Sequence, residues 1–410
     1  MSKPNLHYLK LKKNYLFAEI EKRVLKFRKK HPELELFNLG IGDTILPISK
    51  IILDEIILAT KELGDIDTFK GYGPSEGYDF LREKIKKVDY KDLGIESDEI
   101  FISNGTKSDI ANIQELFSNE IKIAIPDPAY PVYEDSNVLA GRSKGLLKNY
   151  QFENFTYYSY LEDFGFSPTI PNEKCDLIYI CSPHNPTGYA MTKDELKKWI
   201  DYAKDINAII LFDAAYTAFA RSKNIPKTIY EIEGAKDVVV EFKSFSKSCA
   251  FTNLRASYVV IPKSIKLNHP DKDILLHSLW ARRHSTKFGG IPYPIQKGIL
   301  KFYEKDGLLN IQKNIDYYLE NAKLLKNIFE EIGFKVFGGE NSPYLWCRYK
   351  NLSSFEIFDK LLKDFQIISI PGEGFGVSGK NFVRLSSFVK KENVVKINNR
   401  ICKNNLTEVV

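Results

Sequence analysis

Short runs of apolar and β-branched residues recur through the middle of the chain, and a polar turn follows most of them. The runs are Ile100–Ile102, Ile121–Ile125, Leu177–Cys181, Ile209–Phe212, Val238–Phe242 and Tyr258–Ile261. Amphipathic stretches lie between several of these runs, such as Lys193–Lys204, which follows Thr192, a residue type that caps helices. This alternation of strand and helix predicts a largely parallel sheet covered by helices.

The two ends of the chain have a different pattern. Residues 307–333 have the period of a long amphipathic helix, and Tyr15–Phe27 also has a helical pattern. Three apolar segments near the C-terminus are typical of strands, namely Lys335–Phe337, Tyr344–Arg348 and Phe382–Leu385. A chain of 410 residues suits two domains. We therefore predict a large α/β domain at residues 48–292 and a smaller α+β domain built from residues 1–47 and 293–410.

Composition and charge exclude several classes of protein. The net charge of +6 comes from 59 basic and 53 acidic residues, a small excess over a large surface, so nucleic-acid binding is not indicated. No stretch approaches the roughly 20 apolar residues that cross a bilayer. The five cysteines are odd in number and lack metal-ligand spacing, which favours a reducing compartment and no metal site. With a polar N-terminus, these features predict a cytoplasmic enzyme without a membrane partner.

The most informative motif is Ser244-Phe245-Ser246-Lys247, which is followed by Arg255. A lysine that forms a Schiff base needs a lowered pKa and a fixed position beside the substrate. The two hydroxyls and the guanidinium suit a phosphate dianion, which Arg can bind with two hydrogen bonds. An exposed polar loop with a surface lysine is the alternative explanation for this string.

Two further polar motifs follow apolar runs. Asp213 ends the run Ile209–Phe212, and its carboxylate could pair with a protonated pyridine nitrogen, which would make that ring an electron sink. Tyr216, three residues later, could reach a phenolic oxygen on the same ring. A helix N-cap is the alternative role for Asp213. Asn185 lies between Pro183 and Pro186, which fix its backbone so that it can donate to a ring oxygen or to a substrate carboxylate.

Two turns complete the set. Gly105, Thr106 and Lys107 lie between a predicted strand and the helical run Asp109–Phe117, where backbone N–H groups can face an anion. Tyr130, held between prolines, could stack on a pyridine ring, although packing on the core explains a loop aromatic equally well. All five motifs fall at the carboxyl ends of predicted strands, where α/β proteins bind ligands. Together they indicate one site for a phosphorylated pyridine cofactor.

These motifs resemble the fold type I aminotransferases, the aspartate aminotransferase superfamily, in Asn185–Gly188, Asp213-x-x-Tyr216 and Ser244–Lys247 with Arg255. Segments 13–17, 38–43, 71–74 and 337–346 are similar to the LL-diaminopimelate aminotransferase family in particular. The resemblance implies an aspartate aminotransferase-like fold with a mostly parallel sheet of the seven-stranded type. It also implies ping-pong transamination between an amino acid and a 2-oxo acid in a homodimer, with pyridoxal 5′-phosphate as the cofactor.

The resemblance further implies a role for each site residue. Lys247, Asp213 and Tyr216 would be the catalytic residues, with Lys247 carrying the cofactor and moving the proton. The cofactor would be held by Tyr72 of the second copy and by Gly105, Thr106, Lys107, Tyr130, Asn185, Asp213, Tyr216, Ser244, Ser246, Lys247 and Arg255. The substrate would be bound by Tyr15, Gly42, Asn185 and Arg384, where Arg384 would clamp the α-carboxylate.

Three positions depart from that family's pattern. Gly289 stands where an asparagine contacts the distal end of the substrate, Ser75 stands where some members carry a glutamate, and Asn253 replaces a glycine. The loss of a hydrogen bond to a distal amine changes selectivity strongly. The resemblance makes LL-diaminopimelate with 2-oxoglutarate the first hypothesis, and the Gly289 departure favours the alternative of another amino acid. The alternatives are an aminotransferase for another amino acid in a specialised pathway, or a lyase or decarboxylase on the same fold.

Overall fold

The structure, a computed structural model, describes the backbone of residues 2–12 and 15–407, and the side chains of the same residues apart from 15, 17 and 404–407. Its main sheet has seven strands in the order β2-β8-β7-β6-β5-β3-β4. Every neighbouring pair is parallel except the two that β8 makes with β2 and β7. The strands are β2 (Ile100–Ser103), β3 (Ile123–Asp127), β4 (Phe155–Ser159), β5 (Leu177–Cys181), β6 (Ile209–Asp213), β7 (Val239–Ser244) and β8 (Ser257–Val260). The predicted mostly parallel sheet is confirmed.

Strand β4 was absent from the sequence prediction. It lies at the edge of the sheet, and four of its five residues are only partly buried. An edge strand of this kind carries no continuous apolar run, so a search for such runs misses it. The other six strands occupy the predicted runs within about three residues, the accuracy expected for element ends.

Helices cover both faces of the main sheet. They are α2 (Lys50–Glu62), α3 (Asp79–Asp89), α4 (Thr106–Asn112), α5 (Val132–Leu139), α6 (Lys193–Ile206), α7 (Ala235–Val238), α8 (Phe245–Ser248), α9 (Leu276–Lys287) and α10 (Tyr293–Phe302). Residues that alternate along β5 enter two different cores, Ile178 on the side of α3, α6 and α10 and Leu177 on the side of α4, α5 and α9. A strand buried on both faces needs the near-continuous apolar sequence that predicted it.

Helix α6 shows how local sequence sets an element. Thr192 accepts a hydrogen bond from the backbone N–H of Glu195, and the Glu195 carboxylate accepts the N–H of Thr192. Leu196, Trp199, Ile200 and Ala203 form its buried stripe at helical spacing. This capping box confirms the predicted N-terminus of the helix.

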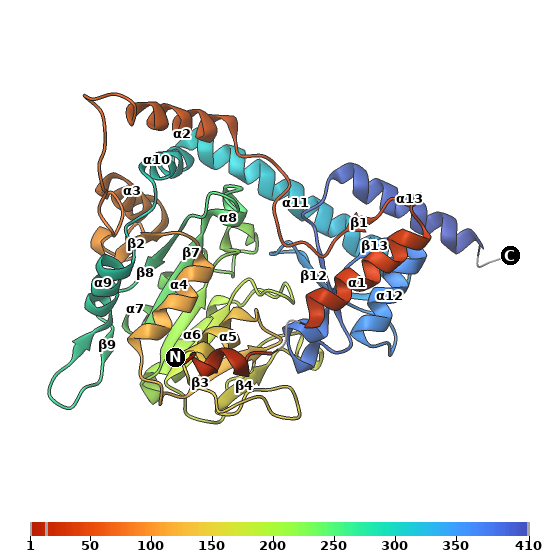
Figure 1. The fold of residues 1–410 in the computed structure, drawn as a ribbon, viewed down its shortest axis with the longest axis horizontal. Helices are drawn as coiled ribbons and strands as arrows, with labels where there is room; N and C mark the ends of the chain where they lie inside the picture. Colours follow the sequence, from red (N-terminus) through yellow and green to blue (C-terminus); the bar gives the residue numbers. More distant parts are fainter. Residues whose placement is uncertain (1, 13–14, 408–410) are drawn as a thin grey trace.

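The C-terminal part of the chain forms a second, antiparallel sheet in the order β11-β12-β15-β14. Its strands are β11 (Lys335–Gly338), β12 (Tyr344–Arg348), β14 (Ile370–Pro371) and β15 (Val383–Ser386), accompanied by α12 (Ser354–Phe365) and α13 (Lys391–Thr407). The N-terminal part joins it, because β1 (Phe37–Asn38) pairs with β13 (Ile367–Ile368). Helix α1 (Tyr15–Lys30) packs beside α12 through Ile20 and Phe358. A short hairpin of β9 (Lys266–Leu267) and β10 (Ile274–Leu275) lies apart from both sheets (Figure 1).

Helix α11 (Lys305–Glu331) connects the two parts of the molecule (Figure 1). Ile311 and Ile315, in its first half, are buried in the core of the main sheet, whereas Leu325 and Phe329 belong to the core of the smaller sheet. Helix α10 also packs against α2 of the larger part. The division at residues 48 and 292 stays a prediction, and this packing favours a second boundary within α11. Among the described residues, no helix has the length and apolar character needed to cross a membrane.

Candidate active site

The five polar motifs of the sequence meet at the edge of the main sheet that is formed by the carboxyl ends of its parallel strands. Strands β2, β3, β5, β6 and β7 run in the same direction, so the segments that follow them lie at the same edge. Strand β8 runs in the opposite direction, and Arg255, which precedes it, therefore lies at that edge too. The two strands through Ser103 and Ser244 flank Ser257 directly, which brings the predicted phosphate-binding segments together.

Lys247 lies in helix α8, directly after β7, with 15% of its side chain exposed. Its ammonium nitrogen lies 3.9 Å from Asp43 Oδ1 and 5.7 Å from the centre of the Phe388 ring. The pKa of Lys247 is lowered to about 8, chiefly by burial; the nearby Asp43 carboxylate opposes this shift, and the charges of Arg384 and Arg255 add to it. A lysine in this environment can supply a neutral amine, the form that condenses with an aldehyde.

This pKa predicts how the reactivity of Lys247 depends on pH in the cofactor-free protein. The neutral fraction of the amine grows as pH rises through about 8, whereas an ordinary lysine stays charged to about 10.4. We expect the rate of Schiff-base formation with pyridoxal to rise with a midpoint near pH 8. Stopped-flow absorbance measures this rate, with the Lys247→Arg variant as the blank. A midpoint above pH 10 would contradict the prediction.

Asp213 ends strand β6 and is buried at 7% exposure. Its Oδ2 accepts from the Tyr133 hydroxyl at 2.7 Å, and its Oδ1 accepts from the backbone N–H of Ala215 at 3.1 Å. Burial raises the pKa of this carboxyl, while both hydrogen bonds lower it. The bond to Ala215 closes a turn that leads into the 3₁₀ helix η5 (Thr217–Phe219) rather than capping an α-helix. Because both donors are neutral, a cationic partner would stabilise this buried carboxylate.

Arg384 lies on β15 with its guanidinium between two aromatic rings, 4.4 Å from the centre of Tyr344 and 4.9 Å from that of Phe375. Its Nη1 donates to Asn185 Oδ1 at 2.8 Å, and its Nη2 donates to the Gly40 carbonyl at 2.9 Å. Its Nε is buried and has no hydrogen-bond partner in the described part of the chain. Arg384 and Asn185, predicted separately from distant motifs, thus form one rigid pair with donor capacity left over.

Tyr344 connects this arginine to Tyr216. The hydroxyls of Tyr216 and Tyr344 lie 2.7 Å apart, while the Tyr344 ring faces the guanidinium of Arg384. A Cβ atom on Gly42 would come within 2.6 Å of the Tyr344 hydroxyl and 3.6 Å of Arg384 Nη2, so this position favours glycine. The structure therefore brings Gly42, Tyr216 and Arg384 together around one buried tyrosine.

The predicted phosphate-binding segments form a compact cluster. Gly105 has a φ of 121°, and a side chain there would overlap the guanidinium of Arg255. Its N–H donates to Ser257 Oγ at 2.9 Å, which fixes the turn before Thr106. The backbone N–H of Ser246 donates to Ser244 Oγ at 3.1 Å. These contacts place backbone N–H groups, hydroxyls and a guanidinium at one corner of the site, the set that a phosphate dianion requires.

The remaining predicted residues are placed differently. Tyr130 is partly buried, and its ring meets that of Tyr133 edge-on at 5.8 Å, while burial and then Asp213 raise the pKa of Tyr130. Lys107 is exposed, and Tyr72 is fully exposed. The side chain of Tyr15 lies outside the described residues.

His184, which follows Pro183, makes structural contacts within the turn that carries Asn185. It is buried and stacked on Tyr160 at 4.0 Å, and burial lowers its pKa to about 3. Its Nδ1 bonds the hydroxyl of Thr187 at 2.8 Å, so it serves to hold the turn that carries Asn185.

Sequence reasoning assigned no role to Asp43, Tyr133 or Tyr344, although all three contact predicted site residues. Asp43 and Tyr344 lie within the segments that resemble the family, which was the available signal. Nothing in the sequence marks Tyr133, because its contact with Asp213 depends on the packing of α5 against β6.

This fold and this group of residues define an aminotransferase: the chain belongs to the aminotransferase class I and II family, whose sequence profile matches residues 35–401. It is 46% identical, over 98% of both chains, to the LL-diaminopimelate aminotransferase of Methanosphaera stadtmanae. The solved L,L-diaminopimelate aminotransferase of Chlamydomonas reinhardtii is similar with a TM-score of 0.91, at 36% identity over 98% of both chains. The aspartate aminotransferase of Thermotoga maritima shares the fold, with a TM-score of 0.80 at 20% identity over 99% of this chain and 100% of that one. The predicted family and fold class are confirmed.

Proposed function

We propose that this aminotransferase uses pyridoxal 5′-phosphate to move an amino group between LL-diaminopimelate and a 2-oxo acid, probed first with 2-oxoglutarate. The full-length similarity to an LL-diaminopimelate aminotransferase at 46% identity is the observation that supports this substrate. Amino transfer is supported by the position of three side chains, Lys247, Asp213 and Arg384, which reach the same edge of the main sheet. Aminotransferases of this family generally depend on the same cofactor.

The residues of the site suit the cofactor. Asp213 offers a buried negative charge for the ring nitrogen, and Lys247 offers an amine whose pKa is about 8. Arg255, together with the turns at Gly105 and Ser244, offers donors for the phosphate, and a side chain at Gly105 would collide with the Arg255 guanidinium. When bound, the cofactor withdraws electrons from the substrate α-carbon and so makes its proton acidic.

The chain's own residues then bind, orient and transfer the proton. Arg384 binds the substrate α-carboxylate, held for this by Asn185 and by the faces of Tyr344 and Phe375. Lys247 would hold the cofactor through its amine and, whenever that amine is free, would be the group that accepts and returns the α-carbon proton. The Tyr216 hydroxyl could accept from Tyr344, which would leave its own proton free to donate to an oxygen of the bound ring.

Changing Arg384 to Lys is expected to reduce kcat/KM roughly 100-fold, mainly through KM, because an ammonium cannot bind a carboxylate with two parallel bonds. Steady-state kinetics with the amino donor varied at saturating 2-oxo acid measures this loss. Arg348→Lys, on the neighbouring strand β12, is the matched control and should retain wild-type KM. Equal effects of the two changes would count against a role for Arg384 in substrate binding.

A second substrate hypothesis has support from two neighbouring positions. Gly289 and Gly290 follow α9, and a Cβ on Gly290 would lie 3.0 Å from the Pro74 carbonyl and 3.9 Å from Ser75 Cα. Two of the three departures from the family pattern, Gly289 and Ser75, therefore lie close together, and neither residue supplies a side-chain amide or carboxylate. Gly289 has open space where a side chain would be. This favours an aminotransferase for a different amino acid as the alternative.

An amino-donor screen on purified protein separates these hypotheses. LL-diaminopimelate should give a higher kcat/KM than glutamate, aspartate or alanine, and pyridoxamine phosphate should form in equal amount to the keto acid. Preference for another donor would support the alternative substrate. Keto acid or amine released without pyridoxamine phosphate would instead indicate a lyase or decarboxylase.

The exposed surface supports a homodimer. Tyr72 is fully exposed, as are large parts of Ile57, Leu58, Ile66 and Phe69, in or just after helix α2. Large exposed apolar side chains grouped in this way mark interaction surfaces. We infer that a second copy covers them and that Tyr72 reaches the phosphate of that copy, in a cytoplasmic enzyme. Light scattering should give twice the mass of the chain, and a fully active monomer would refute the shared site.

A further inference from the structure

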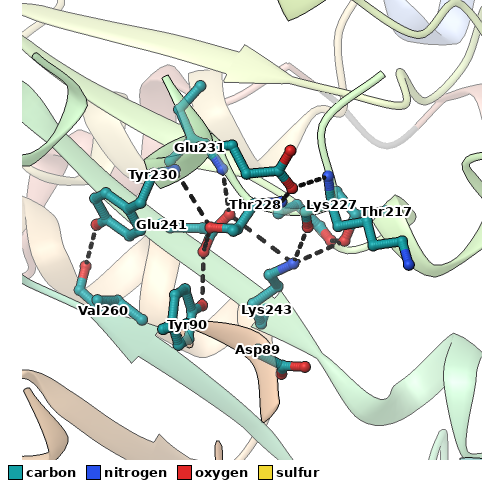
Figure 2. Close-up of polar contacts among 12 residues, drawn as sticks. Asp89, Tyr90, Thr217, Lys227, Thr228, Tyr230, Glu231, Glu241, Lys243 and Val260 are labelled. Atoms are coloured by element: carbon teal, nitrogen blue, oxygen red, sulfur yellow. Dashed lines mark hydrogen bonds and ion pairs between the residues drawn. The ribbon is translucent and has the colours of Figure 1, made fainter. Parts of the chain in front are cut away.

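Two residues of opposite charge lie under the active site on the same face of strand β7. Glu241 and Lys243 are two positions apart, so their side chains point to the same side of the sheet (Figure 2). The Glu241 side chain is fully buried, and the Lys243 side chain is 13% exposed. Buried charges are costly and require partners, so the contacts of these two residues show what they hold in place.

Both oxygens of the Glu241 carboxylate accept hydrogen bonds. Its Oε2 accepts from the hydroxyls of Tyr90 at 2.6 Å and Thr228 at 2.9 Å, and its Oε1 accepts from the backbone N–H of Ile229 at 3.0 Å. The Lys243 ammonium lies 3.9 Å from the same Oε1. Burial raises the pKa of Tyr90 well above its ordinary value, which keeps this hydroxyl protonated as a donor. The carboxylate is therefore a fixed negative charge that faces Lys243.

The Lys243 ammonium is bonded to the loop that follows strand β6. It donates to Thr217 Oγ1 at 3.0 Å and to the Lys227 carbonyl at 2.5 Å (Figure 2). Thr217 directly follows Tyr216, and its hydroxyl donates in turn to the Ala214 carbonyl at 3.0 Å. Lys243 thus fixes the turn between Asp213 and Tyr216 from below.

The backbone of Lys243 connects two more segments of the site. Its carbonyl accepts from the hydroxyl of Thr106 at 3.2 Å, at the start of the predicted phosphate-binding turn. The chain then continues from Lys243 directly into Ser244 and on to Lys247. One residue therefore joins the segments that carry the ring-nitrogen partner, the phosphate donors and the reactive lysine.

We propose that Lys243 is a positioning residue for transamination, which sets the Asp213–Tyr216 turn relative to Lys247, and that Glu241 balances its charge. The proposal rests on the proposed function. If Lys243 only filled space in the core, an apolar side chain would do so equally well, because a buried ion pair adds little net stability. The ammonium is distinguished by its directed bonds to Thr217 and Lys227, which an apolar chain cannot make.

The test compares Lys243→Met and Thr217→Val in the holoenzyme, with Lys204→Met as the matched control, an exposed lysine paired with Asp237. Either site variant should lower kcat roughly 10- to 100-fold with KM unchanged, since misplaced groups slow the reaction without weakening substrate binding. Each should also shift the pH midpoint of the absorbance band of the lysine-bound cofactor. The double variant should lose little more than Lys243→Met alone, because the two residues act through one contact.

Lys243→Arg, which keeps the charge and can donate to both acceptors, should restore part of kcat. The proposal is overturned if Lys243→Met and Thr217→Val keep the wild-type kcat and absorbance midpoint while only their melting temperature falls. Failure of the proposed function is distinguishable, because the wild-type protein would then lack both the absorbance band and amino transfer.

Discussion

Replacing Lys247 by Ala is expected to abolish amino transfer, with a loss of roughly 10⁴-fold or more, because the cofactor's point of attachment and the proton carrier disappear together. The ammonium is largely buried and its pKa is lowered to about 8, so its removal should not unfold the protein. Single-turnover transamination and the absorbance of the bound cofactor measure the two effects. The covalent band should be absent, while the phosphate donors near Gly105 and Arg255 should still bind the cofactor reversibly.

Two further variants make this result specific to Lys247. Lys247→Arg keeps the positive charge but cannot supply a neutral amine, so it should be as inactive as the alanine variant. Lys263→Ala removes an exposed lysine paired with Asp98 and should keep full activity. An alanine variant that retained a borohydride-reducible bond to the cofactor would show that another lysine carries it.

Changing Asp213 to Asn should lower kcat roughly 10³-fold, because the amide no longer holds a negative charge opposite the ring nitrogen. The side chain keeps its size, and its single carbonyl oxygen can accept from Tyr133 or from the N–H of Ala215. The α-carbon proton should therefore be removed more slowly while KM changes little. A primary isotope effect with α-deuterated substrate, larger in the variant than in the wild type, measures this step.

The control for Asp213 is a buried acid at the opposite edge of the sheet. Glu99 precedes β2, is 7% exposed, and accepts from the backbone N–H groups of Glu96 and Lys263. Glu99→Gln should lower the melting temperature without changing the isotope effect. If both variants lose the same activity, Asp213 contributes stability alone and the electrostatic role is wrong.

Local sequence predicted that the polar motifs meet at one edge of the sheet, because each motif directly follows a strand. In a parallel sheet the carboxyl ends of the strands share an edge, so the order of strands and turns places Asn185, Asp213 and Lys247 together without further information. The edge strand β4 escaped prediction, since partial exposure leaves it without a continuous apolar run.

Contacts between distant segments could not be predicted from the residues alone. Tyr344 lies 128 positions from Tyr216, yet their hydroxyls are 2.7 Å apart. Arg384 reaches Asn185 over 199 positions, and this pair exists because the smaller sheet packs against the edge of the larger one. Glu241 and Lys243 alternate with apolar residues, as polar residues do in an ordinary strand with one face in solvent. Nothing in the sequence shows that the face carrying this ion pair is buried.

The sequence by itself determined the strand–helix alternation, the identity of the motifs and their common edge, because these depend on residue type and spacing within one segment. Tertiary structure decided which donors face Asp213, what lowers the pKa of Lys247, and how Arg384 is held between two rings. These properties are set by burial and by neighbours that belong to other parts of the chain, and a side chain acquires both only when the two sheets and their helices pack together.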